Sequence, residues 1–166
     1  MKVSEFTFDS STAHNKIFTR LYEPDGEPKA VLQISHGMAE HSALYKPFCE
    51  YMAQRGFVVV INDHLGHGRS VTSGALYGHF GEKGGLYNVV EDQRNLQSIM
   101  REKYPERKIM TIDSLCASLG QGLFVHYAVK KQREGASMEE LSAYLEALRP
   151  HLCHWFTVDD LMYLKR

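Results

Sequence analysis

The sequence predicts an α/β fold with a mostly parallel sheet, helices on both faces of that sheet and two antiparallel strands at its start. Short apolar runs alternate with longer segments of helical periodicity, a rhythm typical of strands joined by helical crossovers. Residues 30–34, 57–61 and 108–112 are the predicted core strands. The second of these is continuously apolar, as expected of a central strand covered on both faces.

The first 26 residues predict the antiparallel pair. Phe6 and Phe8 alternate with polar residues, and residues 17–21 repeat the alternation. The polar stretch DSSTAHN lies between them, which favours two strands joined by a turn. A second turn is indicated by Glu23-Pro24-Asp25-Gly26.

Two helices are predicted between the core strands. Pro47 suits a first helical turn, Phe48, Tyr51 and Met52 share one face, and Gly56 can end the helix in a left-handed cap. Apolar residues recur at helical spacing again over residues 86–104. The intervening residues 62–85 are rich in Gly and His and are predicted to be a long loop, of a kind that is usually functional or disordered.

The last third predicts more helix. Residues 118–133 have helical periodicity, and a capping-box pattern at 137–140 precedes a helix running to about Leu148. Residues 152–158 are compatible with a strand, and Asp159-Asp160 with a last helical turn.

Composition excludes several classes of function. A chain of 166 residues favours one domain, and a net charge of −1 gives no electrostatic basis for binding nucleic acid or an anionic membrane. The longest apolar run, residues 57–61, is far too short to span a bilayer, and the N-terminus has no apolar signal-peptide core. The three separated cysteines fit free thiols in a reducing cytoplasm.

Two loop motifs directly follow buried strands. Residues 35–42 read SHGMAEHS and residues 62–70 read NDHLGHGRS. Open α/β sheets place their ligand sites at the carboxyl ends of the strands, where both motifs lie. Gly37 allows a sharp turn and leaves the following amide free to point into a cleft. An ester hydrolase needs such a donor for the oxyanion that forms on acyl attack.

These motifs carry a family resemblance. HGMAEHS, DHLGHGRS, GHFGEKGG, VEDQRNL and EKYPE, in that order over residues 1–109, closely resemble α/β-hydrolases of the bacterial lysophospholipase and monoacylglycerol lipase type. The resemblance implies hydrolysis of a lipid-like or acylglycerol ester, without a cofactor, through serine attack and an acyl-enzyme. It implies that the Met38 N–H is one oxyanion donor. It also implies a structural loop at residues 63–70; the motif residues of the two loops are His36, Gly37, Gly66, His67 and Gly68.

One departure from the family concerns the second loop. Leu65 stands where the family usually has Arg, so we expect weaker ionic anchoring of that loop. Two groups of residues resemble metal ligands, and neither supports a predicted metal site. His64 and His67, with Asp63 beside them, lack a third well-placed ligand. On a strand, His151 and Cys153 would face one way and His154 the other.

The nucleophile motif departs further. A G-x-S-x-G elbow should follow residues 108–112, but the chain reads IDSLCASLG over 112–120. Ser114 has Ile112 and Cys116 at the glycine positions. Ser118 has Gly120 behind it and is a weak candidate nucleophile, with the Leu119 N–H as a second oxyanion donor only in that case. The alternative, which we favour, is that Ser118 caps the next helix.

The sequence does not contain a convincing complete catalytic triad. The chain order of this fold is Ser, then Asp or Glu, then His. Acids between residues 134 and 146 with His151 or His154 would satisfy the order, but those acids lie on or beside short helices.

The second half carries another resemblance. Residues 111–166, with DS-x-x-AS-x-G-x-G and FTVDDL-x-YLKR, resemble the middle of a DegV-family fatty-acid-binding protein. We therefore expect a hydrolase half at 1–110 and a DegV-like strand-helix segment at 111–166 packed on the same sheet. Such a truncated or chimeric chain would be inactive as an esterase, bind a lipid-like ester or fatty acid, and self-associate through an uncovered sheet edge. The alternative function is a fatty-acid-binding module.

Overall fold

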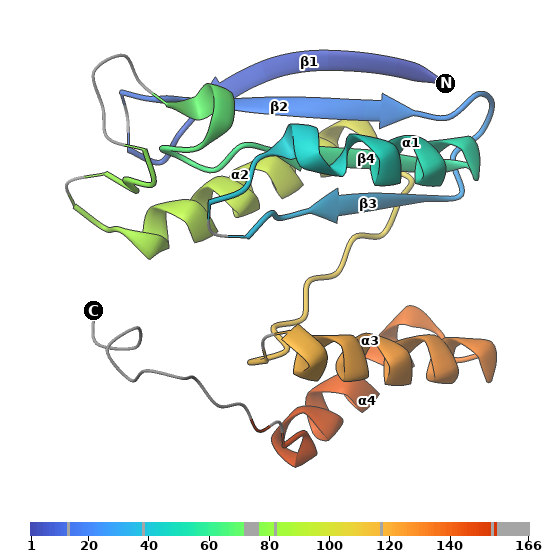
Figure 1. Ribbon diagram of the computed structural model, residues 1–166. Coiled ribbons are helices and arrows are strands. Elements are labelled where there is room, and N and C mark those ends of the chain that lie inside the picture. Colours follow the sequence, from blue (N-terminus) through green and yellow to red (C-terminus); the bar gives the residue numbers. More distant parts are fainter. Residues whose placement is uncertain are drawn as a thin grey trace. The chain divides into compact units, whose positions relative to one another are not determined.

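The computed structural model describes residues 1–12, 14–37, 39–71, 77–81, 83–116, 118–153 and 155. The chain divides into two compact units, Met1–Ile109 and Met110–Arg166. Each unit is described by itself below (Figure 1).

The first unit is built on a four-stranded sheet with the order β1-β2-β4-β3 (Figure 1). Its strands are β1 (Lys2–Asp9), β2 (Lys16–Glu23), β3 (Ala30–Ile34) and β4 (Phe57–Asn62). The predicted antiparallel pair at the start is confirmed as β1 and β2. The predicted parallel neighbours at 30–34 and 57–61 are confirmed as β3 and β4.

The α/β class is confirmed, but the described sheet is mixed rather than mostly parallel. β2 pairs antiparallel with β4, so β3–β4 is the one parallel pairing in this sheet. The predicted strand at 108–112 is wrong, because residues 108–116 form no strand. Side chains compete for the backbone just beyond it: Asp113 accepts the Leu115 N–H at 2.8 Å, and Ser114 Oγ accepts the Cys116 N–H at 3.3 Å. Such local bonds favour turns over a ladder.

Helix α1 (Lys46–Gln54) covers one face of the sheet and follows a short 3-10 turn, η1 (Ser42–Tyr45). Gly56 ends the helix with φ +92°, as predicted. The predicted apolar face is partly wrong: Phe48 and Tyr51 are about half exposed, at 48% and 50%. The buried face is instead formed by Cys49 and Ala53, which pack against Tyr22, Val59 and Ile61.

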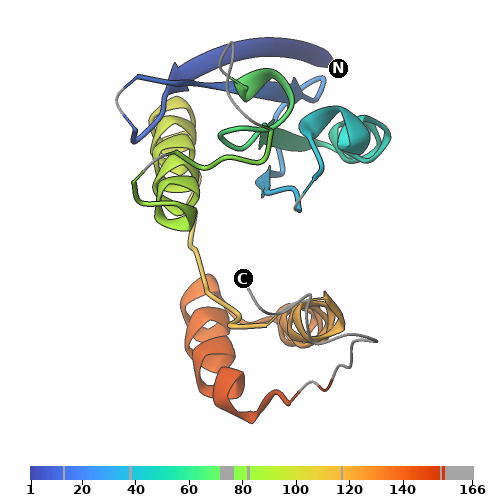
Figure 2. The same cartoon turned by 60° about the vertical axis from the view of Figure 1, so that its left-hand side comes forward.

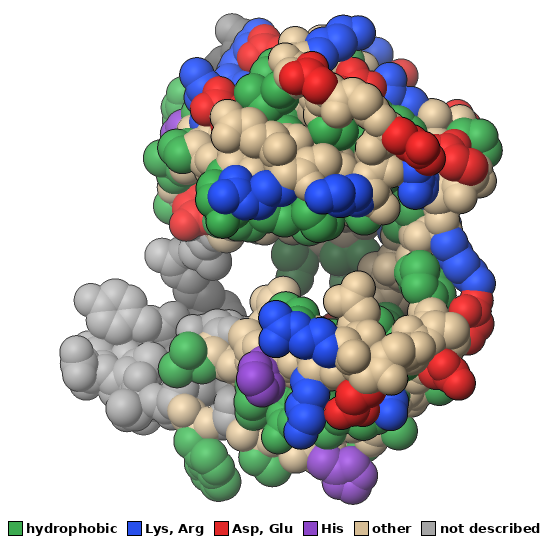
Figure 3. Space-filling view, turned by 90° about the vertical axis from the view of Figure 1, so that its right-hand side faces the viewer, with side chains coloured by type: hydrophobic (Ala, Val, Ile, Leu, Met, Phe, Trp, Pro, Cys, Tyr) green, Lys and Arg blue, Asp and Glu red, His purple; other side chains and the backbone are tan. Residues whose placement is uncertain are grey.

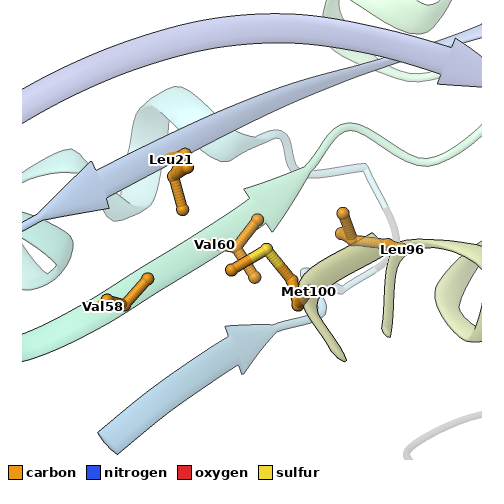
Figure 4. Close-up of a cluster of buried hydrophobic side chains, with 5 residues drawn as sticks. All are labelled: Leu21, Val58, Val60, Leu96 and Met100. Carbon is orange, nitrogen blue, oxygen red and sulfur yellow. The ribbon is translucent and has the colours of Figure 1, made fainter. Parts of the chain in front are cut away.

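Helix α2 (Leu86–Lys103) covers the opposite face, so the expectation of helices on both faces is confirmed (Figure 2). Leu96 and Met100 from α2 meet Leu21, Val58 and Val60 from the sheet in a buried cluster (Figure 4). Alternate residues of β4 therefore serve the two faces. This explains why its sequence is apolar without a break.

The turn between β1 and β2 is fixed to α2. The buried carboxylate of Asp92 accepts the Ser10 hydroxyl at 2.9 Å and the Ser11 N–H at 2.6 Å. This polar contact sets the position of α2 along the sheet.

The second unit contains α3 (Ser118–Arg133), α4 (Met138–Leu148) and the 3-10 turn η3 (Arg149–His151). The predicted capping box is present: Glu140 N–H donates to the Ser137 side chain, and the Glu140 carboxylate accepts the Ser137 N–H. Residues 152, 153 and 155 form no strand, while 154 and 156–166, where the rest of the predicted strand and helical turn fall, lie outside the described residues.

Two properties of the described surface bear on function. None of the described helices is long and apolar enough to cross a membrane. On the face seen in Figure 3, Lys and Arg side chains lie among Asp and Glu on both units, in keeping with the near-zero net charge of −1.

Candidate active site at the strand carboxyl ends

The loops after β3 and β4 meet at one edge of the sheet, as predicted from their parallel pairing. The His64 N–H donates to Nε2 of His36 at 2.9 Å, and the two imidazole ring centroids are 3.9 Å apart. Both side chains are buried, with 5% of each exposed. The two motifs found in the sequence therefore form one structural cluster.

The hydrogen-bond partners assign the tautomers of these two histidines. Nε2 of His36 accepts a backbone N–H, so its Nδ1 carries the proton and donates to the Gly37 carbonyl at 2.8 Å. Nε2 of His64 donates to the His36 carbonyl at 2.9 Å, and its Nδ1 accepts from the Gln93 amide at 3.3 Å. Each ring nitrogen thus already has a partner.

Burial keeps both rings neutral. Desolvation lowers the pKa of His36 and lowers that of His64 to about 4. Fully partnered nitrogens are poor metal ligands, and no group of three or more metal-binding side chains is found among the described residues.

A serine–histidine contact exists here but cannot activate a nucleophile. Ser35 Oγ lies 3.1 Å from Nε2 of His64. That nitrogen carries its proton toward the His36 carbonyl, so it cannot accept the proton of the Ser35 hydroxyl. The His64 side chain is therefore structural in this arrangement.

Asp63 joins the two loops. Its side chain is 2% exposed; Oδ1 accepts the Ser42 N–H at 2.6 Å and Oδ2 accepts the Arg69 N–H at 2.8 Å. Its carbonyl accepts the Ser70 hydroxyl at 2.7 Å. Leu65 is buried, and the loop is anchored by carboxylate-to-backbone bonds. The weaker ionic anchoring expected at Leu65 stays a prediction.

The glycines of the second motif are sterically required. Gly66 has φ +75°, and a Cβ there would lie 2.3 Å from the His79 carbonyl oxygen. Gly68 has φ +49°, and a Cβ there would lie 2.2 Å from Oδ2 of Asp63. His67 stacks on Phe80 with 5.4 Å between ring centroids. These contacts shape the loop.

The loop after β3 closes on Glu40. The Gly37 N–H donates to Oε2 of Glu40 at 2.8 Å, and the Tyr45 hydroxyl donates to the same oxygen at 2.6 Å. Ala39 has φ +60°, a conformation that non-glycine residues rarely adopt. Met38, whose N–H is the predicted oxyanion donor, lies outside the described residues.

The candidate nucleophile belongs to the second unit. Ser118 is the first residue of α3, and Leu119 follows it with 87% of its side chain exposed. The Ser118 side chain lies outside the described residues. His126 is exposed and eight residues further along the same helix, roughly 12 Å along the axis. The described residues thus assemble the two loops, while Ser118 remains a prediction.

Sequence reasoning did not identify the two glutamines, Gln33 and Gln93, that bond beside the histidine cluster. Gln93 on α2 donates to Oδ1 of Asn62 at 2.7 Å, and the Gln33 amide donates to Oε1 of Gln93 at 2.9 Å. The signal that could have found Gln93 is the VEDQRNL motif that contains it, but that motif indicated only the family resemblance.

Comparison with known proteins decides the family. The sequence profile of the Hydrolase_4 family, described as serine aminopeptidase S33, matches residues 26–146. The chain belongs to this family. The fold is similar to that of a carboxyl esterase from Bacillus coagulans, with a TM-score of 0.59 and 32% identity over 64% of this chain and 34% of that one.

Curated relatives confirm both resemblances. A monoacylglycerol lipase of Mycolicibacterium smegmatis is 29% identical over 123 residues, 74% of this chain and 41% of that protein. A DegV domain-containing protein of Clostridium perfringens is 46% identical over 65 residues, 39% of this chain and 22% of that protein. The chain thus spans well under half the length of either relative.

Proposed function

We propose that residues 1–109 supply the oxyanion side of a carboxylic-ester hydrolase for a lipid-like or acylglycerol ester, and that the chain has no activated nucleophile. The observation that carries this is the pair of loops joined by Asp63 and His36 at the carboxyl ends of β3 and β4. The Met38 N–H is the proposed donor. Membership of the family and the names of the lipase and esterase relatives support the ester class.

The family resemblance implies a mechanism without a cofactor. A serine attacks the ester, an acyl-enzyme forms, and water hydrolyses it. Ser118 is the candidate serine and the Leu119 N–H the second donor if it acts. Activation needs a base within hydrogen-bond reach and a third group that orients the base. The histidine nearest to Ser118 in sequence, His126, is two helical turns away, so we infer that Ser118 is not activated.

The test is hydrolysis of an activated ester, p-nitrophenyl butyrate. Serine hydrolases stripped of their triad keep about 10³- to 10⁴-fold catalysis from the oxyanion hole and substrate binding. We expect slow turnover of that kind, unchanged in Ser118→Ala. The control is the same chain in denaturing urea, because its nine histidines can cleave such esters without a folded site. Equal rates for folded and unfolded chain would refute the proposal.

A second candidate function is fatty-acid binding by residues 111–166. It is favoured by the 46% identity to the DegV domain-containing protein. Calorimetric titration with oleate, with no turnover of the ester, would support this candidate over the first.

Two further proposals concern the setting of the chain. The three cysteines Cys49, Cys116 and Cys153 are free thiols, which supports a reducing, cytoplasmic compartment. β3 is an edge strand of the described sheet without charged residues, which supports self-association through that edge.

A further inference from the structure

The loop between β3 and η1 is closed by a single carboxylate oxygen. Oε2 of Glu40 accepts the Gly37 N–H at 2.8 Å and the Tyr45 hydroxyl at 2.6 Å. Tyr45 also packs against the buried cluster beneath α1. The Glu40 side chain therefore links the start of the loop, at Gly37, to Tyr45, which packs on the core.

Two backbone features lie beside this closure. A Cβ on Gly37 would lie 3.2 Å from Oε2 of Glu40, so a larger residue there would push the carboxylate away by a few tenths of an ångström. Ala39 holds φ +60°. A non-glycine residue persists in that region when its surroundings over-determine it. Ala39 lies within the segment that the Glu40 bonds close.

The bond between Gly37 and Glu40 also occupies one of the backbone amides of this loop. Because Gly37 gives its N–H to Glu40, that amide is not free to donate to a substrate oxyanion. The next amide along the chain is that of Met38. Glu40 itself cannot stabilise an oxyanion by charge, since its Tyr45 and Gly37 donors lower its pKa and keep it anionic. A contribution of Glu40 to oxyanion stabilisation is therefore geometric.

We propose that Glu40 is a positioning residue of the ester-hydrolase site: by holding the Gly37 N–H and the Tyr45 hydroxyl on one oxygen, it fixes the start of the loop after β3, the loop to which the proposed oxyanion donor belongs. The inference rests on the proposed function. It assigns to Glu40 a role distinct from that of Asp63, which joins the two loops to each other.

The experiment compares Glu40→Ala and Glu40→Gln with Glu50→Ala as the matched control. Glu50 lies on α1, where it pairs with Lys46 at 3.8 Å. Two readouts are taken on the full chain: the amide proton shift of Gly37 by NMR, and the slow p-nitrophenyl butyrate rate. Thermal melting confirms that each variant is folded.

We expect Glu40→Ala to move the Gly37 amide proton upfield and to lower the ester rate by about 10- to 100-fold, the scale of a misplaced catalytic group. Glu40→Gln keeps an acceptor oxygen and should restore both readouts, and Glu50→Ala should change neither. An unmoved Gly37 amide in Glu40→Ala, or a moved amide with an unchanged rate, overturns the proposal. If the wild type shows no ester rate, the proposed function fails, and the Gly37 amide alone decides whether Glu40 closes the loop.

Discussion

Because the His64 ring is buried, the free energy of unfolding should fall as the pH drops from about 6.5 to about 4. Burial lowers its pKa from 6.5 to about 4 in the folded chain. Between those values the unfolded chain takes up a proton that the folded chain does not, so the free energy of unfolding falls as the pH drops. The contribution is complete above pH 6.5. The loss is about 2 kcal/mol at pH 5 and about 3 kcal/mol below pH 4.

The perturbation that isolates this effect is His64→Gln, which removes the titrating ring. The assay is urea unfolding at pH 7, 6 and 5, followed by circular dichroism, because the single tryptophan, Trp155, lies outside the first unit. We expect the wild type to lose about 2 kcal/mol more than the variant between pH 7 and pH 5. His126→Gln, at an exposed position, is the control and should keep the wild-type slope. Equal slopes for wild type and His64→Gln would refute the reasoning.

The remaining predictions concern packing and association. Gly66→Ala should cost at least about 2 kcal/mol of unfolding free energy in chemical denaturation, because φ is +75° and its Cβ would meet the His79 carbonyl. Gly26→Ala, with φ +82° and open space around it, should cost only about 1 kcal/mol, and equal losses would contradict the steric argument. The chain should associate with rising concentration in sedimentation velocity, and Ala30→Lys at the start of β3 should reduce that association. A wild-type chain that stays monomeric would exclude the edge as an interface.

The parts of the fold that were predictable are those with a strong local pattern. The unbroken apolar run of β4 indicated a strand covered on both faces, and Ser137 with Glu140 indicated a capped helix; both are present. The loops after β3 and β4 were predicted to meet because parallel strands put their carboxyl ends at one edge.

The structural predictions fail where contacts with other parts of the chain decide which structure forms. Residues 108–112 have strand composition, yet a strand forms only with a ladder partner, and the adjoining Asp113 and Ser114 bond to nearby amides instead. On α1, Phe48 and Tyr51 are apolar but exposed, because Cys49 and Ala53 fit more closely against the sheet. Periodicity alone does not choose between two apolar faces.

The site shows the same division. The glycines and histidines of both motifs were found from sequence, but their roles were not. The tautomers of His36 and His64 depend on backbone groups 28 residues away in the chain. The closure of the first loop by Glu40 depends on Tyr45 being held by the core.

The measurement that tests the central claim most directly is labelling of the purified chain with a fluorophosphonate probe, read by intact mass. The account predicts no stoichiometric adduct, because activation needs a base within hydrogen-bond reach, and the histidine nearest to Ser118 in sequence, His126, lies eight residues further along α3. A stoichiometric adduct that disappears in Ser118→Ala and survives in Ser114→Ala would contradict it and make the chain a working serine esterase.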